Sequence, residues 1–290
     1  MTSGPSGVIG WRGPVSTFPF GALAVAFLAA AGGALGCAGG APLLHPARAL
    51  PAGEVRAAGG LSGQIAVGSA AEDLRNAREQ AAANPGQPGQ PGTNPGYAKG
   101  ALVAASIAPG LAPYVSGRVG IGSGVEGGIT YTGRSARIDL RKSFDVGDVS
   151  YSAGAGISVP FYGRHQGDSL PNVDLESLRG YGADVPLLVG WESASGIYKI
   201  WAGPRGGWEH VSIGSLTSEP KDIPGVPDTA LSADRFYVSA VLGLAVGFRH
   251  VHVALEFAGT YNYVSGTYND NKVSVTGIAL TPASALWWTF

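Results

Sequence analysis

Histidine and acidic side chains occur at two places in the chain where their spacing could support hydrolysis. His250, His252 and Glu256 fall on one face if residues 250–261 form a strand, so that one side chain could orient another. The second group consists of Asp184, Glu209 and His210. Hydrolysis also needs a nucleophile or an activated water, and for the first group no serine partner is evident at a suitable spacing. The sequence therefore predicts no catalytic residues.

Metal ions and organic cofactors are not expected either. The single cysteine, Cys37, excludes a cysteine-based metal cluster, and His250 with His252 lacks the third protein ligand that a zinc site needs. The glycine-rich stretch 117–124 superficially resembles a phosphate-binding loop, but no helix is predicted after it. We predict no metal site and no cofactor.

The charge balance excludes a nucleic-acid partner. The formal net charge is −1, and no stripe of basic residues marks a surface for phosphate backbones. Charged residues make up only 13% of the chain, whereas 47 of the 290 residues are glycine. Charge this sparse is about half the usual share, so we expect few solvated faces.

Long stretches of alternating residues dominate the C-terminal part of the chain. Residues 149–161, 181–192, 235–248 and 250–261 each place apolar side chains on one face and mostly Gly, Ser, Thr and a few charges on the other. Strands of soluble proteins average about five or six residues, whereas a tilted strand needs about 9–11 to cross a membrane. Aromatic residues gather at the strand ends, as in the girdles of membrane barrels. We therefore predict an all-β fold, an antiparallel up-and-down transmembrane β-barrel.

Turn residues divide this region into strands of the predicted barrel. Tight turns are predicted at 122–124, 145–148, 193–196 and 249–250, and long connections at 162–178, 214–232 and 262–271. Membrane barrels keep short turns in the periplasm and long loops outside. A weakly alternating segment at 99–108 completes an even number of strands. We predict about ten strands, and eight or twelve also fit.

The N-terminal residues have the layout of a secretion signal. An apolar stretch rich in Ala and Gly follows Arg12 and ends in small residues. The letters "ALGC" at 34–37 come directly after it and resemble the lipobox of bacterial lipoproteins. The resemblance implies that residues 1–36 are a signal peptide and that Cys37 is the lipid-modified first residue of the mature protein.

The region between the signal and the barrel reads as a linker. Residues 37–97 are rich in Ala, Gly and Pro, so we predict a flexible periplasmic segment. Within it, Ser69 and Glu72 match a capping box and predict a short, solvated helix near 70–83. The barrel domain is then predicted to fill residues 98–290.

The chain ends on an alternating apolar pattern formed by Leu286, Trp288 and Phe290. This pattern resembles the assembly signal of Gram-negative outer-membrane proteins. The resemblance implies an outer-membrane location, with membrane lipid and the outer-membrane assembly machinery as partners. The sequence does not determine the oligomeric state.

Polar side chains on the inward faces indicate what the barrel contains. The predicted interior residues are Arg118, Glu126, Arg137, Asp139, Arg141, Asp184, Lys199, Arg205, Glu209, Arg235, His252 and Glu256. Because buried charges must be paired and a barrel of this size has little free space, we predict an ion-paired interior with a structural role. A narrow passive channel is the second interpretation. An outer-membrane hydrolase, or a barrel that binds partners through loops 162–178 and 214–232, is the alternative.

Overall fold

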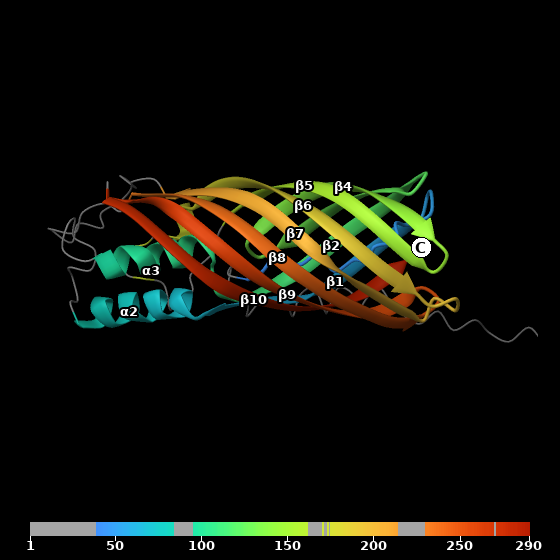
Figure 1. The fold of residues 1–290 in the computed structure, drawn as a ribbon, viewed down its shortest axis with the longest axis horizontal. Coiled ribbons are helices and arrows are strands. Elements are labelled where there is room, and N and C mark those ends of the chain that lie inside the picture. Colours follow the sequence, from blue (N-terminus) through green and yellow to red (C-terminus); the bar gives the residue numbers. More distant parts are fainter. Residues whose placement is uncertain are drawn as a thin grey trace, which may run out of the picture. The chain divides into compact units, whose positions relative to one another are not determined.

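Ten antiparallel strands close into a barrel. The computed structural model describes residues 39–83, 95–161, 170, 173, 175–213, 230–269 and 271–290. The strands are β1 (Val55–Val67), β2 (Gly110–Gly122), β3 (Val125–Thr132), β4 (Ser135–Val146), β5 (Val149–Pro160), β6 (Arg179–Glu192), β7 (Tyr198–Ile213), β8 (Leu231–Phe248), β9 (Val251–Tyr268) and β10 (Asn271–Thr289). Each strand pairs with its sequence neighbours, and β1 closes the ring against β10 (Figure 1). The prediction of a ten-stranded up-and-down barrel is confirmed.

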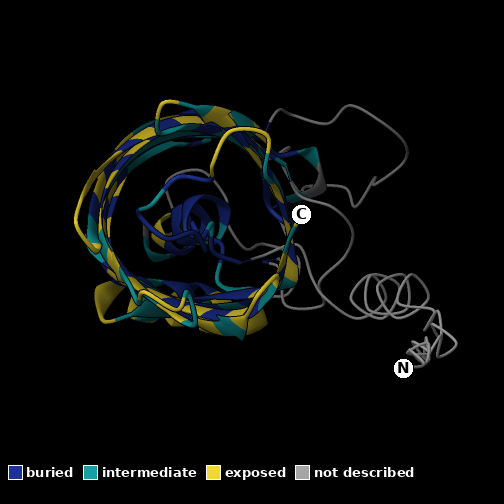
Figure 2. Cartoon of the chain, turned by 90° about the vertical axis from the view of Figure 1, so that its right-hand side faces the viewer, coloured by how far each residue is buried: buried dark blue, intermediate teal, exposed yellow. Residues whose placement is uncertain are grey.

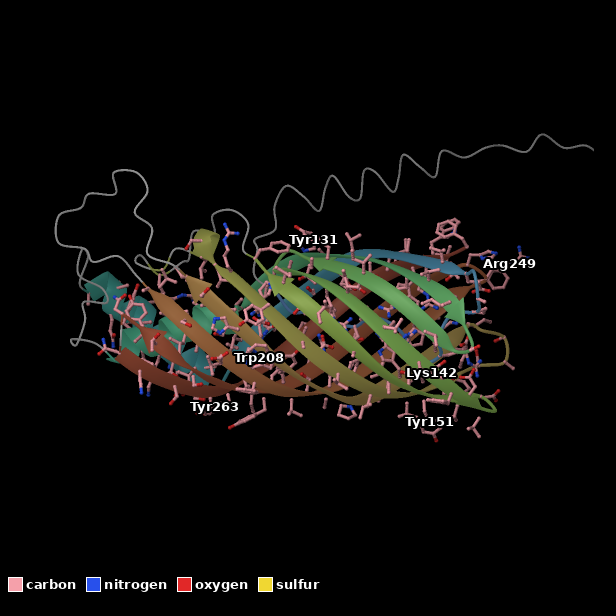
Figure 3. The ribbon with its side chains drawn as sticks, turned by 90° about the horizontal axis from the view of Figure 1, so that it is seen from above. Tyr131, Lys142, Tyr151, Trp208, Arg249 and Tyr263 are labelled. Atoms are coloured by element: carbon pink, nitrogen blue, oxygen red, sulfur yellow. The ribbon has the colours of Figure 1, made fainter. Side chains whose placement is uncertain are left out.

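Apolar side chains cover the outside of this barrel. Along β8, Val238 and Leu242 are 62% and 58% exposed. Val241, which precedes Leu242 and faces the lumen, is only 4% exposed. The same alternation recurs along the other strands, so the exposed side is apolar and the buried side is mostly small or polar. Figure 3 shows Trp208 and Tyr263 toward the end that carries the helices and Tyr151 toward the opposite end. Contact between this apolar surface and water would be unfavourable, whereas contact with the hydrocarbon core of a membrane is favourable.

All four connections at one end of the barrel are tight turns, whereas the opposite end carries two tight turns and the longer connections. Ser123, Gly147, Gly196 and Arg249 have positive φ angles, which such short connections require. The C-terminus lies at this same end, because the Phe290 amide donates to the Val55 carbonyl. Short turns face the periplasm in barrels of this class. The opposite end, with the helices, therefore faces outward.

The structure corrects the predicted linker and first strand. Within residues 37–97, β1 pairs with both β10 and β2 and is part of the barrel wall. The weak strand predicted at 99–108 is instead helix α3 (Pro95–Ser106). Alanine and glycine hide the alternation of β1, whose larger outward residues are few, and the alanine-rich α3 sequence favours a helix. The number of strands stays at ten because one gain offsets one loss.

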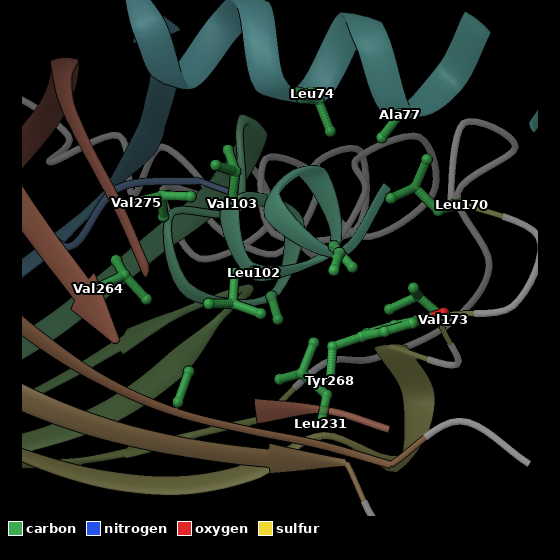
Figure 4. Close-up of a cluster of buried hydrophobic side chains, with 14 of the residues drawn as sticks. Leu74, Ala77, Leu102, Val103, Leu170, Val173, Leu231, Val264, Tyr268 and Val275 are labelled. Atoms are coloured by element: carbon green, nitrogen blue, oxygen red, sulfur yellow. The ribbon is translucent and has the colours of Figure 1, made fainter. Parts of the chain in front are cut away.

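Two helices lie at the outward mouth of the barrel, where α3 packs against β8, β9 and β10 and α2 packs mainly on α3. Helix α2 (Ser69–Ala83) matches the predicted helix but is not simply solvated, because Leu74 and Ala77 pack toward α3. Leu102 and Val103 of α3 are fully buried against the barrel ends (Figure 4). No helix among the described residues is both long and apolar enough to cross a membrane.

The long loop predicted at 262–271 is also wrong. Strand β9 continues to Tyr268, and β10 begins at Asn271. Val264 and Tyr268 point inward and join the apolar cluster formed with the helices. The turn-forming residues of this segment are typical of a loop. Val264 and Tyr268 find apolar partners only when the two helices pack beside them.

Leu242→Arg tests whether lipid covers the outer wall. Leu242 lies midway along β8 between Phe236 and Phe248, so the charge would sit near the centre of the bilayer. We expect the free energy of unfolding in lipid vesicles to fall by about 2–4 kcal/mol. Val146→Arg, at the turn end of β4, is the control and should cost at most about 1 kcal/mol. Equal effects at both positions would contradict the assignment.

Gly243→Val tests the packing of the interior at the same level. A Cβ at Gly243 would lie 2.0 Å from Cε2 of Trp201, so the side chain needs space that the lumen does not have. We expect a loss of about 1–3 kcal/mol in the free energy of unfolding. Gly259→Ala is the control, since a Cβ there meets nothing within 4 Å, and its stability should stay close to that of the unchanged protein.

Candidate functional site

The chain before β1 runs through the lumen. Residues 39–50, called the plug segment here, lie inside the ring of strands, and Figure 2 shows buried chain within that ring. Leu43, Leu44 and His45 are each at most 2% exposed, and Ala47 is fully buried. Because the plug segment forms no helix or strand, its backbone amides need partners from the barrel wall.

Two glutamates of the wall supply such partners. The Leu43 and Leu44 amides donate to the two carboxylate oxygens of Glu256 at 2.7 and 2.8 Å. The Leu50 amide donates to Oε2 of Glu126 at 2.8 Å. Hydrogen bonds to an ionised acceptor are stronger than neutral ones, so these carboxylates fix both halves of the plug segment.

Arginines and acids alternate along the inner wall. Nη2 of Arg118 lies 2.6 Å from Oδ1 of Asp139, and Nε of Arg137 lies 2.8 Å from Oδ2 of Asp184. Each of four acids contacts two arginines. These trios are Arg118–Glu126–Arg141, Arg118–Asp139–Arg137, Arg137–Asp184–Arg205 and Arg134–Glu209–Arg235. The shared arginines join three of the trios into one continuous chain of ion pairs.

Backbone carbonyls also accept hydrogen bonds from the buried arginines. The lumen buries more arginines than acids, so the near balance predicted from the sequence is incomplete. Nη1 of Arg134 donates to the Ile107 carbonyl at 3.2 Å, and Nη1 of Arg235 donates to the Ser106 carbonyl at 3.1 Å. These carbonyls lie at the C-terminal end of α3, where the helix dipole is negative. Helix α3 therefore acts as a counter-charge inside the barrel.

A small polar cavity remains between these groups. Its volume is about 50 Å³, and its lining includes Arg134, Arg137, Arg205 and Arg235. Glu209 and the plug residue Ala41 complete this part of the wall. A space of this size holds a few water molecules.

The exposed apolar wall and the ion-paired interior together decide the class of the protein. Only a closed barrel satisfies every strand hydrogen bond while its whole outer surface contacts hydrocarbon. The chain is a ten-stranded membrane β-barrel. Its exposed apolar wall, its short periplasmic turns and its closed ladder of strands all belong to that class.

Solved outer-membrane barrels show distant similarity to this membrane barrel. No family model and no curated protein matches the sequence. The structure is similar to Neisserial surface protein A, at 11% identity and a TM-score of 0.32, over 82% of this chain and 96% of that one. It is also similar to the outer membrane protease OmpT of Escherichia coli, at 8% identity and a TM-score of 0.30, over 83% and 97%. The outer membrane phospholipase A of Escherichia coli follows, at 10% identity and a TM-score of 0.26, over 80% and 89%. Similarity this distant carries no argument about the function of the barrel.

The first histidine group does not assemble. His250 lies exposed in a turn, where Nδ1 is 2.9 Å from the Thr289 carbonyl. His252 faces the interior, with Nε2 3.0 Å from the Gly196 carbonyl. Glu256 is bound by the plug segment and by the Trp201 indole. The three side chains thus make separate structural contacts.

The second group is divided between the two sides of the wall. Asp184 and Glu209 lie in interior ion pairs. His210 belongs to the outer wall of the membrane barrel, where its Nδ1 is 3.0 Å from Oδ1 of Asp234. Sequence analysis missed Asp234, because only the register of β7 against β8 brings it beside His210.

Other predicted and missed residues have clear positions. Lys199 pairs with Glu192 near the periplasmic turn. Arg56 was missed because it lies in the predicted linker, and its guanidinium sits 4.9 Å from the centre of the Trp287 ring. Arg134 was missed because it lies in a turn between predicted strands. Apart from His252 and Glu256, described above, the remaining predicted interior residues occupy the ion-pair trios.

The predicted terminal signals have different outcomes. Leu286, Trp288 and Phe290 are 53%, 40% and 66% exposed on the outer wall of β10 and the residue after it. Their role as an assembly signal stays a prediction. Cys37 and the signal peptide 1–36 lie outside the described residues, and lipid modification of Cys37 stays a prediction as well.

Glu126→Ala tests the ion-paired lumen. The substitution leaves Arg118 and Arg141 without their shared acid and frees the Leu50 amide. Removing one partner of a buried ion pair costs about 3–5 kcal/mol, and we expect that loss in the free energy of unfolding measured in detergent. Glu79→Ala, exposed on α2, is the control and should change stability by at most about 0.5 kcal/mol.

Proposed function

We propose that the protein is a lumen-closed barrel with a structural role in the outer membrane. The observation that supports this is the plug segment, which is buried along the lumen and fixed by Glu256 and Glu126. Buried carboxylates and arginines hold the wall and the plug together, so opening the lumen would separate charges from their partners. A barrel built in this way contributes a rigid, sealed element to the cell envelope.

The ion-paired interior favours this role over a passive channel. A selective channel needs a continuous water path lined by groups that bind an ion weakly enough to release it. Here Arg137 and Arg205 are both held by Asp184, and Arg134 and Arg235 are both held by Glu209. Conduction would require the plug segment to leave, which would expose these groups.

Membrane lipid and the assembly machinery remain the proposed partners. The apolar wall supports the first, and the exposed pattern of Leu286, Trp288 and Phe290 supports the second. Binding through the loops predicted at 162–178 and 214–232 falls largely outside the described residues.

Ion conductance separates the sealed barrel from the channel. We expect the purified barrel, inserted in planar lipid bilayers, to give no steady current. A variant lacking residues 39–50 removes the plug segment but keeps β1, and we expect it to conduct. Heat-modifiable migration in gel electrophoresis should verify that both proteins are folded.

A second, full-length variant keeps the proposal testable if the deletion variant does not fold. Glu256→Ala removes the acceptor of the Leu43 and Leu44 amides without shortening the chain. We expect intermittent current from this variant as the plug segment detaches. A steady current through the unchanged protein would contradict the proposed closed lumen.

A further inference from the structure

A hydrogen-bonded histidine and aspartate stand on the lipid-facing side of the barrel. His210 of β7 and Asp234 of β8 are direct partners in the strand register. Nδ1 of His210 lies 3.0 Å from Oδ1 of Asp234. The indole Nε1 of Trp208 donates to the same oxygen at 3.1 Å, which fixes the carboxylate against the ring. Among the described residues, His210, Asp234 and Trp208 make no ion pair with a side chain of the lumen. The proposed sealed-barrel role does not involve them.

Strand alternation places the pair outside the barrel. Glu209 and Arg235, the sequence neighbours of the two residues, form an ion pair inside the lumen. Adjacent residues of a strand point to opposite faces, so His210 and Asp234 point toward the membrane. The side chain of His210 is 25% exposed and that of Asp234 is 46% exposed. Packing of the lumen therefore does not explain why a polar pair occupies this position on the outer wall.

The aromatic girdle fixes the depth of the pair. Trp208, Phe236 and Tyr263 are aligned in register across β7, β8 and β9, one row closer to the centre of the barrel. Figure 3 shows Trp208 and Tyr263 toward the helical, outward end. Aromatic girdles mark the boundary between hydrocarbon and head groups. His210 and Asp234 thus lie one row beyond this aromatic row, on its head-group side.

A serine lies two residues after the histidine along β7, whereas the β6 side of the imidazole is covered by Tyr181, with ring centroids 5.3 Å apart. Ser212 follows His210 by two residues on β7, so both point to the same face and their Cα atoms are about 6.6 Å apart. Asp234 engages Nδ1, which leaves Nε2 of the imidazole to accept a proton from a hydroxyl. Arg179 of β6 lies opposite Ser212 in the register and is exposed. A hydroxyl, an imidazole, a carboxylate and a guanidinium therefore occupy neighbouring register positions on the outer wall.

We propose that Ser212, His210 and Asp234 form a serine hydrolase triad that cleaves fatty-acyl esters of outer-leaflet lipids. Oγ of Ser212 attacks the ester carbonyl while its proton moves to Nε2 of His210. Negative charge develops on the carbonyl oxygen, where the Arg179 guanidinium stabilises it. The carbon–oxygen bond to the lipid alcohol then breaks, and the imidazolium returns the proton to that alcohol. Water, activated by His210, hydrolyses the acyl-serine to release the fatty acid and restore Ser212.

Asp234 acts as a positioning residue in this scheme. Its carboxylate holds the imidazole in the tautomer that presents Nε2 and stabilises the imidazolium that forms. Trp208 holds the carboxylate in turn. The spacing of His210 and Ser212 is visible in the sequence, but without Asp234 the two residues give no indication of a triad.

Covalent labelling of Ser212 tests the proposal directly. The folded, full-length protein in mixed micelles is treated with a long-chain alkyl fluorophosphonate and analysed by mass spectrometry. We expect one adduct on Ser212 and none in Ser212→Ala. His210→Ala should slow labelling by at least about 100-fold, because the general base is lost. Asp234→Asn should slow it less and shift its pH profile, a change that a purely structural residue would not cause.

Fatty-acid release identifies the source of the ester. One arm supplies diacyl phosphatidylethanolamine and the other supplies lipopolysaccharide, and release in either arm supports the proposal. Ser265→Ala is the matched control, because Ser265 lies opposite Asp234 on the β9 side, away from His210. We expect its rate to equal that of the unchanged protein.

Two results would overturn the triad. One is an unchanged protein, verified as folded by heat-modifiable migration, that releases no fatty acid in either arm and takes up no label. The other is labelling that persists in Ser212→Ala. Neither result affects the sealed-lumen proposal, which conductance tests separately.

Discussion

Neutralisation of buried arginine charge is the constraint on which the rest of this barrel depends. A lumen too narrow for bulk water cannot solvate a guanidinium, so every arginine needs an acid, a carbonyl or an aromatic ring. Acids on the inner wall, such as Glu126 and Asp184, each contact two arginines. This sharing links strands β2, β3, β4, β6 and β7 through side chains as well as through their backbone ladders.

The same constraint explains why segments outside the wall belong to the fold. The plug segment donates its amides to Glu256 and Glu126, and its carbonyls accept from Arg141 and Arg205. Helix α3 offers its C-terminal carbonyls to Arg134 and Arg235. The lumen holds more arginines than acids, and these carbonyls accept hydrogen bonds from guanidinium groups that share an acid. Plug, helix and wall are therefore one electrostatic unit.

The barrel wall separates two chemical environments across a single residue step. Glu209 faces the lumen and holds two arginines, whereas His210 beside it faces the membrane and contacts Asp234. The proposed sealed lumen leaves the outer wall and the loops as the surfaces that can contact other molecules. The proposed sealed lumen and the proposed outer-wall triad thus use opposite faces of the same strands and do not compete.

Local alternation determined the fold class, because a strand's inward and outward residues are encoded two apart and lipid selects the apolar face. Arg118, Glu126 and Asp184 could be assigned to the interior for the same reason. Alternation failed where alanine and glycine hide it, as in β1, and where an apolar helix resembles a strand, as in α3. Partners that lie far apart in sequence were decided only by the tertiary structure. The register of β7 against β8 brings Asp234 to His210, and closure of the ring carries Leu43 to Glu256 across 213 positions. Register and closure depend on all ten strands together, so no single stretch of sequence contains them.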